Sequence, residues 1–114
     1  MGTKEIEDYI NKIRSYIYKI RSSDFINFRG APKNVGVYIL YKNSSVVYIG
    51  STKSLKRRLN SLFSNNPKRH VLNKRVKQGY YKDCSVKILE INDIHEARAL
   101  EYLLIAIFRP EHNR

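Results

Sequence analysis

Two short apolar runs, separated by only four polar residues, constrain the fold more than any other feature of the sequence. Residues Val35–Tyr41 and Val46–Ile49 are rich in β-branched and aromatic side chains, and Lys42–Ser45 lies between them. Residues of these types favour strands, and so short a polar link allows only a tight connection. The pattern therefore predicts an antiparallel β-hairpin.

The first segment of the chain has the pattern of an amphipathic helix, with isoleucines at spacings of three and four residues. The stripe lies within residues 3–22 and consists of Ile6, Ile10, Ile13, Ile17 and Ile20. Such a stripe usually packs on its own domain, and we expect that here. A homodimer interface and a membrane surface are the other two uses. Because no apolar run approaches the ~20 residues of a membrane span, we expect no membrane partner.

After the hairpin, the sequence predicts two helices, a third strand and a final helix, at residues 54–63, 67–78, 83–91 and 94–108. Asp93 and Glu96 have the spacing of a capping box at the start of the final helix. This order predicts an α+β fold with a three-stranded, mainly antiparallel sheet flanked by helices, and an additional N-terminal amphipathic helix. We assign residues 1–30 to the N-terminal helix and loop and residues 31–114 to the core of one compact domain.

The charge of the chain is high and unevenly distributed. There are 22 Lys and Arg residues against 10 Asp and Glu, a net charge of +12, and no acidic residue occurs from Phe25 to Lys82. A surface of this kind attracts a polyanion, which releases counterions when it binds. We therefore expect a nucleic acid as a partner, and a merely basic protein is the alternative.

The cysteine content and the N-terminal residues bear on the cellular compartment. Cys84 is the only cysteine, which fits a reducing environment, and the N-terminus is charged from Lys4 onward without an apolar signal core. We expect an intracellular protein, cytoplasmic or, in a eukaryotic or viral setting, nuclear.

Glu101 is the most informative single residue on physical grounds. It lies within the most apolar predicted helix, among Ala97, Leu104 and Ile105, and that helix is expected to be largely buried. A buried carboxylate needs a cation or strong hydrogen bonds. Mg²⁺ suits a lone oxygen ligand, and an ion pair with Arg98 or another basic side chain satisfies the carboxylate equally well.

Five motif elements occur in a characteristic order. Gly36-Val37-Tyr38 lies in the first predicted strand, Tyr48-Ile49-Gly50 in the second, and Arg58, Glu101 and Asn113 follow. In this the sequence resembles the GIY-YIG nuclease superfamily over about residues 35–113, and its motifs are most similar to the N-terminal nuclease domain of UvrC. The resemblance implies a metal-dependent DNA endonuclease that hydrolyses phosphodiester bonds with Mg²⁺ or Mn²⁺.

The resemblance also implies a role for each matching catalytic residue. Glu101 would bind the metal, and Arg58 would contact the scissile phosphate. Tyr38 would help to activate the attacking water, and Tyr48 would position water and phosphate. Asn113 would support the site by hydrogen bonding. A phenol has an ordinary pKa of about 10, so a tyrosine base needs a nearby metal or cation to lower it. The alternative is a tyrosine that only orients water.

Further residues near the motifs are expected to bind substrate. Gly50 would let the phosphate approach the backbone closely, because glycine has no Cβ. Four more residues complete this set: Ser51, Lys53, Arg57 and Lys74.

One position departs from the family pattern. Leu62 occurs four residues after Arg58, where many relatives carry tyrosine or histidine. His70 is the candidate substitute, and an exposed histidine on a basic helix is the alternative. Because of this departure, we consider two functions. The first is a nuclease with low intrinsic sequence specificity that nicks DNA or is directed by DNA structure. The second is a catalytically impaired nucleic-acid-binding module. Because the chain has little room for a DNA-reading domain, we expect weak sequence specificity, or specificity that comes from a partner or from DNA structure. A homodimer and a specificity-giving partner protein are the two assemblies considered.

Overall fold

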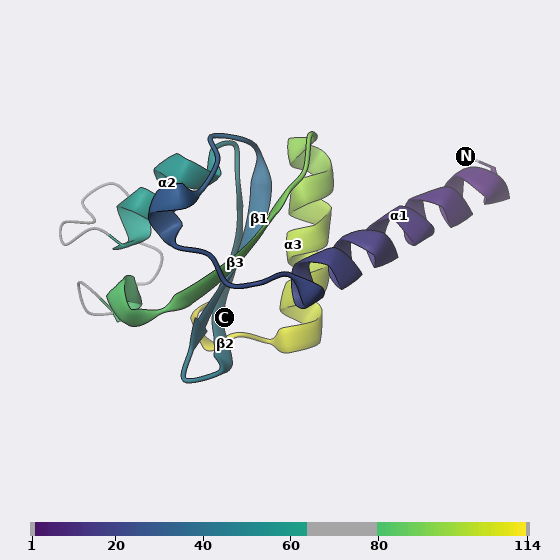
Figure 1. Cartoon of the computed structure of the whole chain (residues 1–114). Coiled ribbons are helices and arrows are strands. Elements are labelled where there is room, and N and C mark those ends of the chain that lie inside the picture. The colour runs from purple at the N-terminus through teal and green to yellow at the C-terminus, as the bar shows by residue number, and fades with distance from the viewer. Residues whose placement is uncertain (1, 64–79, 114) are drawn as a thin grey trace.

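The computed structural model describes residues 2–63 and 80–113 of the 114-residue chain (Figure 1). The predicted α+β class and the order of helices and strands are confirmed, while the helix predicted at residues 67–78 lies outside the described residues. The elements are α1 (Thr3–Ser22), β1 (Gly36–Lys42), β2 (Ser45–Thr52), α2 (Leu55–Phe63), β3 (Ser85–Glu90) and α3 (Ile94–Phe108), with short 3-10 turns η1 (Phe28–Gly30), η2 (Tyr80–Asp83) and η3 (Glu111–Asn113).

The sheet has the order β2-β1-β3, and both pairings are antiparallel. The hairpin between β1 and β2 is tighter than the polar link suggested, because Lys42 and Ser45 both belong to strands. Only Asn43 and Ser44 remain in the turn, with φ angles of 52° and 67°. Two successive positive φ angles match the right-handed twist of the flanking strands, which is why two-residue hairpins adopt them.

Both faces of the sheet are covered, and they hold two separate cores (Figure 1). Side chains alternate along a strand, so Tyr38 and Leu40 of β1 face α2, whereas Val37 and Ile39 face α1 and α3. Burial on both faces explains why β1 is an almost continuous apolar run. It also places α2 and α3 on opposite sides of the sheet.

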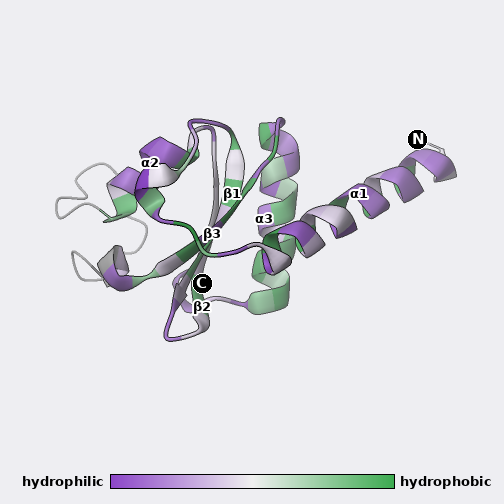
Figure 2. Ribbon diagram, viewed as in Figure 1, coloured by the Kyte–Doolittle hydropathy of each residue, from purple (hydrophilic) through white to green (hydrophobic). Residues whose placement is uncertain are grey.

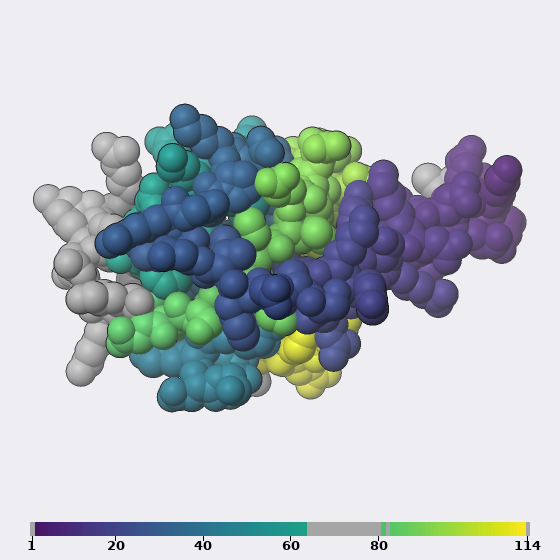
Figure 3. All heavy atoms as spheres, in the orientation of Figure 1, coloured from purple at the N-terminus to yellow at the C-terminus, as the bar shows by residue number. Residues whose placement is uncertain are grey.

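Helix α1 follows the predicted range, but only part of its apolar stripe packs on the domain. Ile13 and Ile20 are buried, whereas Ile6, Tyr9 and Ile10 remain 44–46% exposed. The N-terminal half projects away from the rest of the molecule (Figures 1 and 3). The expected intramolecular packing is therefore confirmed only for the C-terminal half of α1. No helix within residues 2–63 and 80–113 combines the length and apolar composition needed to span a bilayer.

The prediction that the final helix is largely buried is wrong. Helix α3 buries only Ala97, Leu100 and Leu104, whereas Tyr102 is 70% exposed and Ile107 is 55% exposed. Apolar residues therefore continue around α3 to its outer surface (Figure 2). Apolar composition alone does not reveal which face of a helix is covered.

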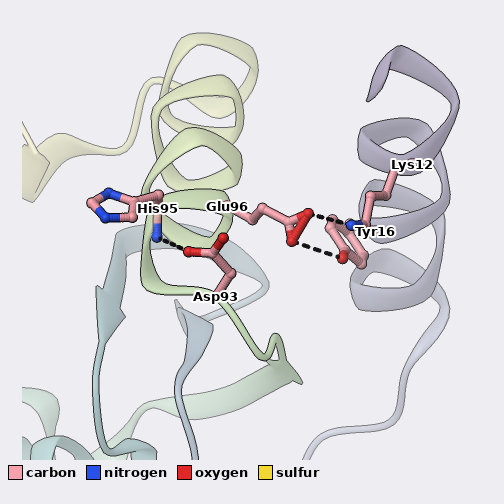
Figure 4. Close-up of polar contacts among 5 residues, drawn as sticks. All are labelled: Lys12, Tyr16, Asp93, His95 and Glu96. Carbon is pink, nitrogen blue, oxygen red and sulfur yellow. Dashed lines mark hydrogen bonds and ion pairs between the residues drawn. The ribbon is translucent and has the colours of Figure 1, made fainter. Parts of the chain in front are cut away.

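The predicted capping box at the start of α3 forms only in part. The Asp93 side chain accepts a hydrogen bond from the His95 amide at 2.8 Å. The Glu96 carboxylate does not return to Asp93, because it is paired with Lys12 and accepts a hydrogen bond from Tyr16 of α1 at 3.5 Å (Figure 4). Glu96 thus fastens α1 to α3.

Candidate functional site

The two motif tyrosines lie on the same face of the sheet, beside a basic side chain from α2. The register pairs Tyr38 with Gly50 and Leu40 with Tyr48, so Tyr38 and Tyr48 are diagonal neighbours with ring centroids 6.0 Å apart. Arg58, in the first half of α2, donates from Nη1 to the Tyr38 hydroxyl at 3.4 Å. The hairpin and α2 therefore bring together three of the predicted catalytic side chains.

Gly50 is required by a contact inside the protein. A Cβ built on Gly50 would lie 2.3 Å from the Tyr38 hydroxyl oxygen and 2.4 Å from Cζ of the same ring. Tyr38 therefore extends directly over Gly50 from the neighbouring strand. This contact gives a reason for the glycine that sequence reasoning did not find, since that reasoning considered only the approach of a phosphate.

Glu101 contacts strand β2 from the other face of the sheet. Ser51 pairs with Val37, so its side chain points toward α3, where its hydroxyl donates to Glu101 Oε1 at 2.5 Å. Within the part of the chain that the structure describes, no lysine or arginine forms an ion pair with Glu101, so the alternative pairing with Arg98 is not observed. Glu101 is partly exposed.

The electrostatics link Glu101 to both phenols. Burial is the main cause that raises the pKa of Tyr38 well above its ordinary value, and the Arg58 guanidinium opposes this shift only in part. Burial also raises the pKa of Tyr48, and the Glu101 charge adds to the increase. The chain's own residues therefore keep both phenols protonated at neutral pH, so that each hydroxyl has a proton to donate.

The two tyrosines differ in their access to solvent. Tyr38 is fully buried, whereas Tyr48 is only partly buried. Tyr48 is therefore the phenol that a solvent molecule can reach, and Tyr38 lies behind it against Gly50 and Arg58.

Asn113 secures the edge strand of the site. Its Oδ1 accepts from the Ile49 amide at 2.9 Å, and its Nδ2 donates to the Ile49 carbonyl at 2.8 Å. Strand β2 lies at the edge of the sheet, where backbone groups need other partners. Asn113 provides such a partner at Ile49, which lies between Tyr48 and Gly50. It therefore fixes the position of this part of β2.

A tyrosine–histidine pair that sequence reasoning missed lies beside Tyr48. The hydroxyl of Tyr81, in η2, is 2.8 Å from Nδ1 of His112, and the Tyr81 ring centroid is 6.3 Å from that of Tyr48. The position of His112 next to Asn113 was the only sequence signal for this pair. Tyr81 is buried and packs beside Tyr48.

The remaining residues considered in the sequence analysis are exposed, buried or outside the described part of the chain. Lys53 and Arg57 are exposed near the start of α2. His70 and Lys74 lie outside the described residues. Leu62 is buried in the core between α2 and the sheet, so its side chain offers no polar group to the site.

The donor set fits a metal bound mainly through water. Among the described residues, no group of three or more histidine, cysteine or acidic side chains could hold an ion. Glu101 therefore offers one carboxylate, and Mg²⁺ commonly takes one or two carboxylates, keeps several waters and adds substrate phosphates. The partial exposure of Glu101 leaves room for those waters.

Comparison with known proteins agrees with this geometry. The family model described as the GIY-YIG catalytic domain matches residues 34–114. Curated relatives include the UvrABC system protein C of Methanococcus maripaludis, 39% identical over 90 residues that cover 77% of this chain, and that of Nitrosococcus oceani, 39% identical over 82 residues that cover 68%. This chain spans only 16% and 12% of the length of these two proteins.

Solved structures with the same fold include the GIY-YIG N-terminal endonuclease domain of UvrC from Thermotoga maritima. A point mutant bound to its catalytic divalent cation superposes with a TM-score of 0.61 at 29% identity, covering 90% of this chain and 97% of the other. The magnesium-bound form has a TM-score of 0.58 at 28% identity, with the same coverage of both chains. The chain therefore belongs to the GIY-YIG family, and it is a GIY-YIG endonuclease domain.

Proposed function

We propose that this domain hydrolyses phosphodiester bonds in DNA with one Mg²⁺ or Mn²⁺ ion held at Glu101. The observation that carries the proposal is the position of the Glu101 carboxylate against β2, where it accepts a hydrogen bond from Ser51 and its charge acts on Tyr48, with the Arg58–Tyr38 pair on the other face of the sheet. Glu101 is the only predicted metal ligand. The similar UvrC domain was solved with magnesium bound, which supports the same ion here.

The arrangement suits phosphodiester hydrolysis, in which negative charge builds up on phosphate oxygens. The bound ion supplies charge stabilisation and makes its water more acidic. Arg58 supplies a second positive charge at a fixed position, because its guanidinium is held by the Tyr38 hydroxyl.

The tyrosines are proposed to act as donors. The raised pKa of Tyr38 and its complete burial favour a role in holding Arg58 over direct removal of a proton from water. Tyr48 is partly exposed and protonated, so it can donate a hydrogen bond to water or phosphate. Asn113 keeps Tyr48 in place through the Ile49 backbone.

DNA is the proposed substrate because of the charge and the family. The net charge of +12 and the exposed Lys53 and Arg57 suit a phosphate backbone, whose contacts carry no sequence information. We therefore propose low intrinsic sequence specificity, with nicking or structure-directed cleavage. The relatives belong by name to a UvrABC system, which supports a partner protein as the source of specificity. An intracellular setting is part of the same proposal.

A supercoiled plasmid tests the activity directly. We expect conversion to the nicked form with Mg²⁺ or Mn²⁺ and no conversion with EDTA. The second candidate, a nucleic-acid-binding module without cleavage, is favoured only by Leu62, whose side chain belongs to the core. Salt-sensitive DNA binding without metal-dependent nicking would establish that candidate instead.

The N-terminal half of α1 supports a homodimer as the assembly. Its exposed stripe of Ile6, Tyr9 and Ile10 is flanked by the acids Glu5, Glu7 and Asp8, whereas residues 9–23 contain basic residues and no acid. Two copies that pair their α1 helices antiparallel would cover the stripe and place opposite charges together. Sedimentation should show a dimer that Ile6→Lys and Ile10→Lys dissociate. A monomer at every concentration would indicate a different partner.

The same helix bears on the domain limits. Ile13 and Ile20 belong to the buried cluster that contains Ile39 of β1. This supports the proposal that residues 1–30 and the core at residues 31–114 fold as one compact domain.

A further inference from the structure

Ser51 occupies an unusual position between the strand motif and the helix carboxylate. It directly follows Gly50 on β2, and the alternation of side chains turns it away from the phenols and toward α3. Its hydroxyl donates to Glu101 Oε1 at 2.5 Å. It is the one polar partner that the structure gives to this carboxylate among the described residues.

We propose that Ser51 is a positioning residue that orients the Glu101 carboxylate for a divalent cation. The inference rests on the proposed function, in which Glu101 binds the metal. A glutamate side chain on a partly exposed helix surface has several rotamers, and ordering them opposes binding. A hydrogen bond to Oε1 selects one orientation before the ion arrives and leaves Oε2 for the ion. Hydrogen-bonding partners of this kind commonly change metal affinity by about 10- to 100-fold.

The neutrality of the donor matters as much as its position. On the same helix, Glu96 is paired with the Lys12 ammonium, so its charge is already compensated (Figure 4). Glu101 accepts a hydrogen bond from a neutral hydroxyl and forms no ion pair with any described residue, so these partners leave its negative charge uncompensated. Ser51 therefore orders the carboxylate without competing with the metal for its charge.

This assignment differs from the role predicted for Ser51 in substrate binding. A serine hydroxyl has a single proton to donate. When that proton is given to Glu101, it cannot also be given to a phosphate oxygen. The two roles therefore predict different losses when the hydroxyl is removed: one in metal affinity and one in DNA affinity.

A matched pair of substitutions in the full chain separates the hydroxyl from the shape of the side chain. Ser51→Thr keeps a hydroxyl and Ser51→Val replaces it with a methyl group of similar size, and both β-branched residues suit a strand. Mn²⁺ binding without DNA is measured by calorimetry or by the paramagnetic resonance of free Mn²⁺. Ser45→Ala, at an exposed position on the same strand, is the control, and Glu101→Gln defines the loss of the site.

The expected result is a Kd for Mn²⁺ about 10- to 100-fold higher in Ser51→Val, with Ser51→Thr and Ser45→Ala close to wild type. Thermal unfolding without metal should be similar in Ser51→Val and Ser51→Thr. Unchanged Mn²⁺ binding in Ser51→Val, with binding lost in Glu101→Gln, would overturn the role of Ser51 alone. Retained Mn²⁺ binding in Glu101→Gln would overturn the proposed metal site and the role of Ser51 with it. Weaker DNA binding in EDTA, with unchanged Mn²⁺ affinity, would instead make Ser51 a substrate contact.

Discussion

The two sides of helix α3 use the same residue type in opposite ways. On the side facing α1, Glu96 is paired with Lys12 and also accepts a hydrogen bond from Tyr16 (Figure 4). On the side facing β2, Glu101 accepts a single hydrogen bond from the neutral Ser51 hydroxyl and has no ion-pair partner among the described residues. A carboxylate whose charge is already compensated joins two helices, whereas an uncompensated one suits a cation.

The difference shows that the side chains around a glutamate determine its role more than its residue type or the helix that carries it. Both glutamates lie on one helix and both are partly exposed. The environment of Glu101 leaves its negative charge able to raise the pKa values of Tyr38 and Tyr48, and the same charge can attract a metal. The contrast can be tested by substituting each side in turn.

Substitution of the two glutamates should produce the largest difference. Glu101→Gln removes the charge that would hold the metal, so we expect plasmid nicking to be abolished while the fold is retained. Glu96→Gln should leave nicking near the wild-type rate, because its partners are on α1. Parallel nicking assays measure both. Equal losses in the two variants would contradict the distinction between the two sides.

The second largest difference in nicking rate is expected between substitutions of the cations on the two sides. Arg58→Ala is expected to slow nicking about 10²- to 10³-fold, since loss of one contact to developing charge typically has this effect. Lys12→Met removes a cation from the α1 side and should leave the rate unchanged. Single-turnover rates at saturating enzyme measure the effect, and circular dichroism checks that both variants are folded. A slow Lys12→Met variant would mean that α1 contributes to the chemistry.

Gly50→Ala tests the packing on the β2 side. The added methyl group would collide with the Tyr38 ring, so we expect a loss of about 1–3 kcal/mol in the free energy of unfolding, as for other overpacked sites. Nicking should slow as well, because Tyr38 holds Arg58. Urea denaturation measures the stability. Gly30→Ala, where a Cβ would meet no atom within 4 Å, is the matched control and should show little change.

The smallest effect should come from Tyr16→Phe on the α1 side. The Tyr16 hydroxyl donates to Glu96 at 3.5 Å, a long hydrogen bond in addition to the ion pair with Lys12. We expect a thermal midpoint lowered by less than in Gly50→Ala and an unchanged nicking rate. A larger decrease would mean that the attachment of α1 is more important for stability than its exposed N-terminal half suggests.

Local pattern was sufficient to predict most of the fold. Hydrophobic spacing located α1 and α3 over their observed ranges, and the β-branched runs located the hairpin. The predicted turn was two residues too long. Lys42 and Ser45 are polar, but they lie at the ends of strands, where polar side chains can face solvent. Burial of α3 was overestimated because composition does not state which face is covered.

The site was predicted as a set of residues, but not as a set of contacts. The motif order brought Tyr38, Tyr48, Arg58 and Glu101 into one hypothesis. The structure groups the two tyrosines with Arg58 on one face of the sheet, whereas Glu101 contacts Ser51 of β2 from the other face. The partners of the two glutamates could not be deduced, since Ser51 is 50 residues from Glu101 and Tyr16 is 80 residues from Glu96 along the chain. Pairings over such separations depend on the tertiary arrangement, which no local pattern encodes.

The Tyr38 ring above Gly50 has a consequence for how this hairpin can vary. The two residues meet because the turn between β1 and β2 contains only Asn43 and Ser44 and because the register shifts once, between Leu40 and Tyr41. One residue inserted there would shift the pairing by one position and turn Tyr48 to the opposite face of the sheet. Surface loops usually tolerate insertions, but the length of this turn helps to determine which face of the sheet Tyr48 occupies, so natural variants should change its residues and preserve their number.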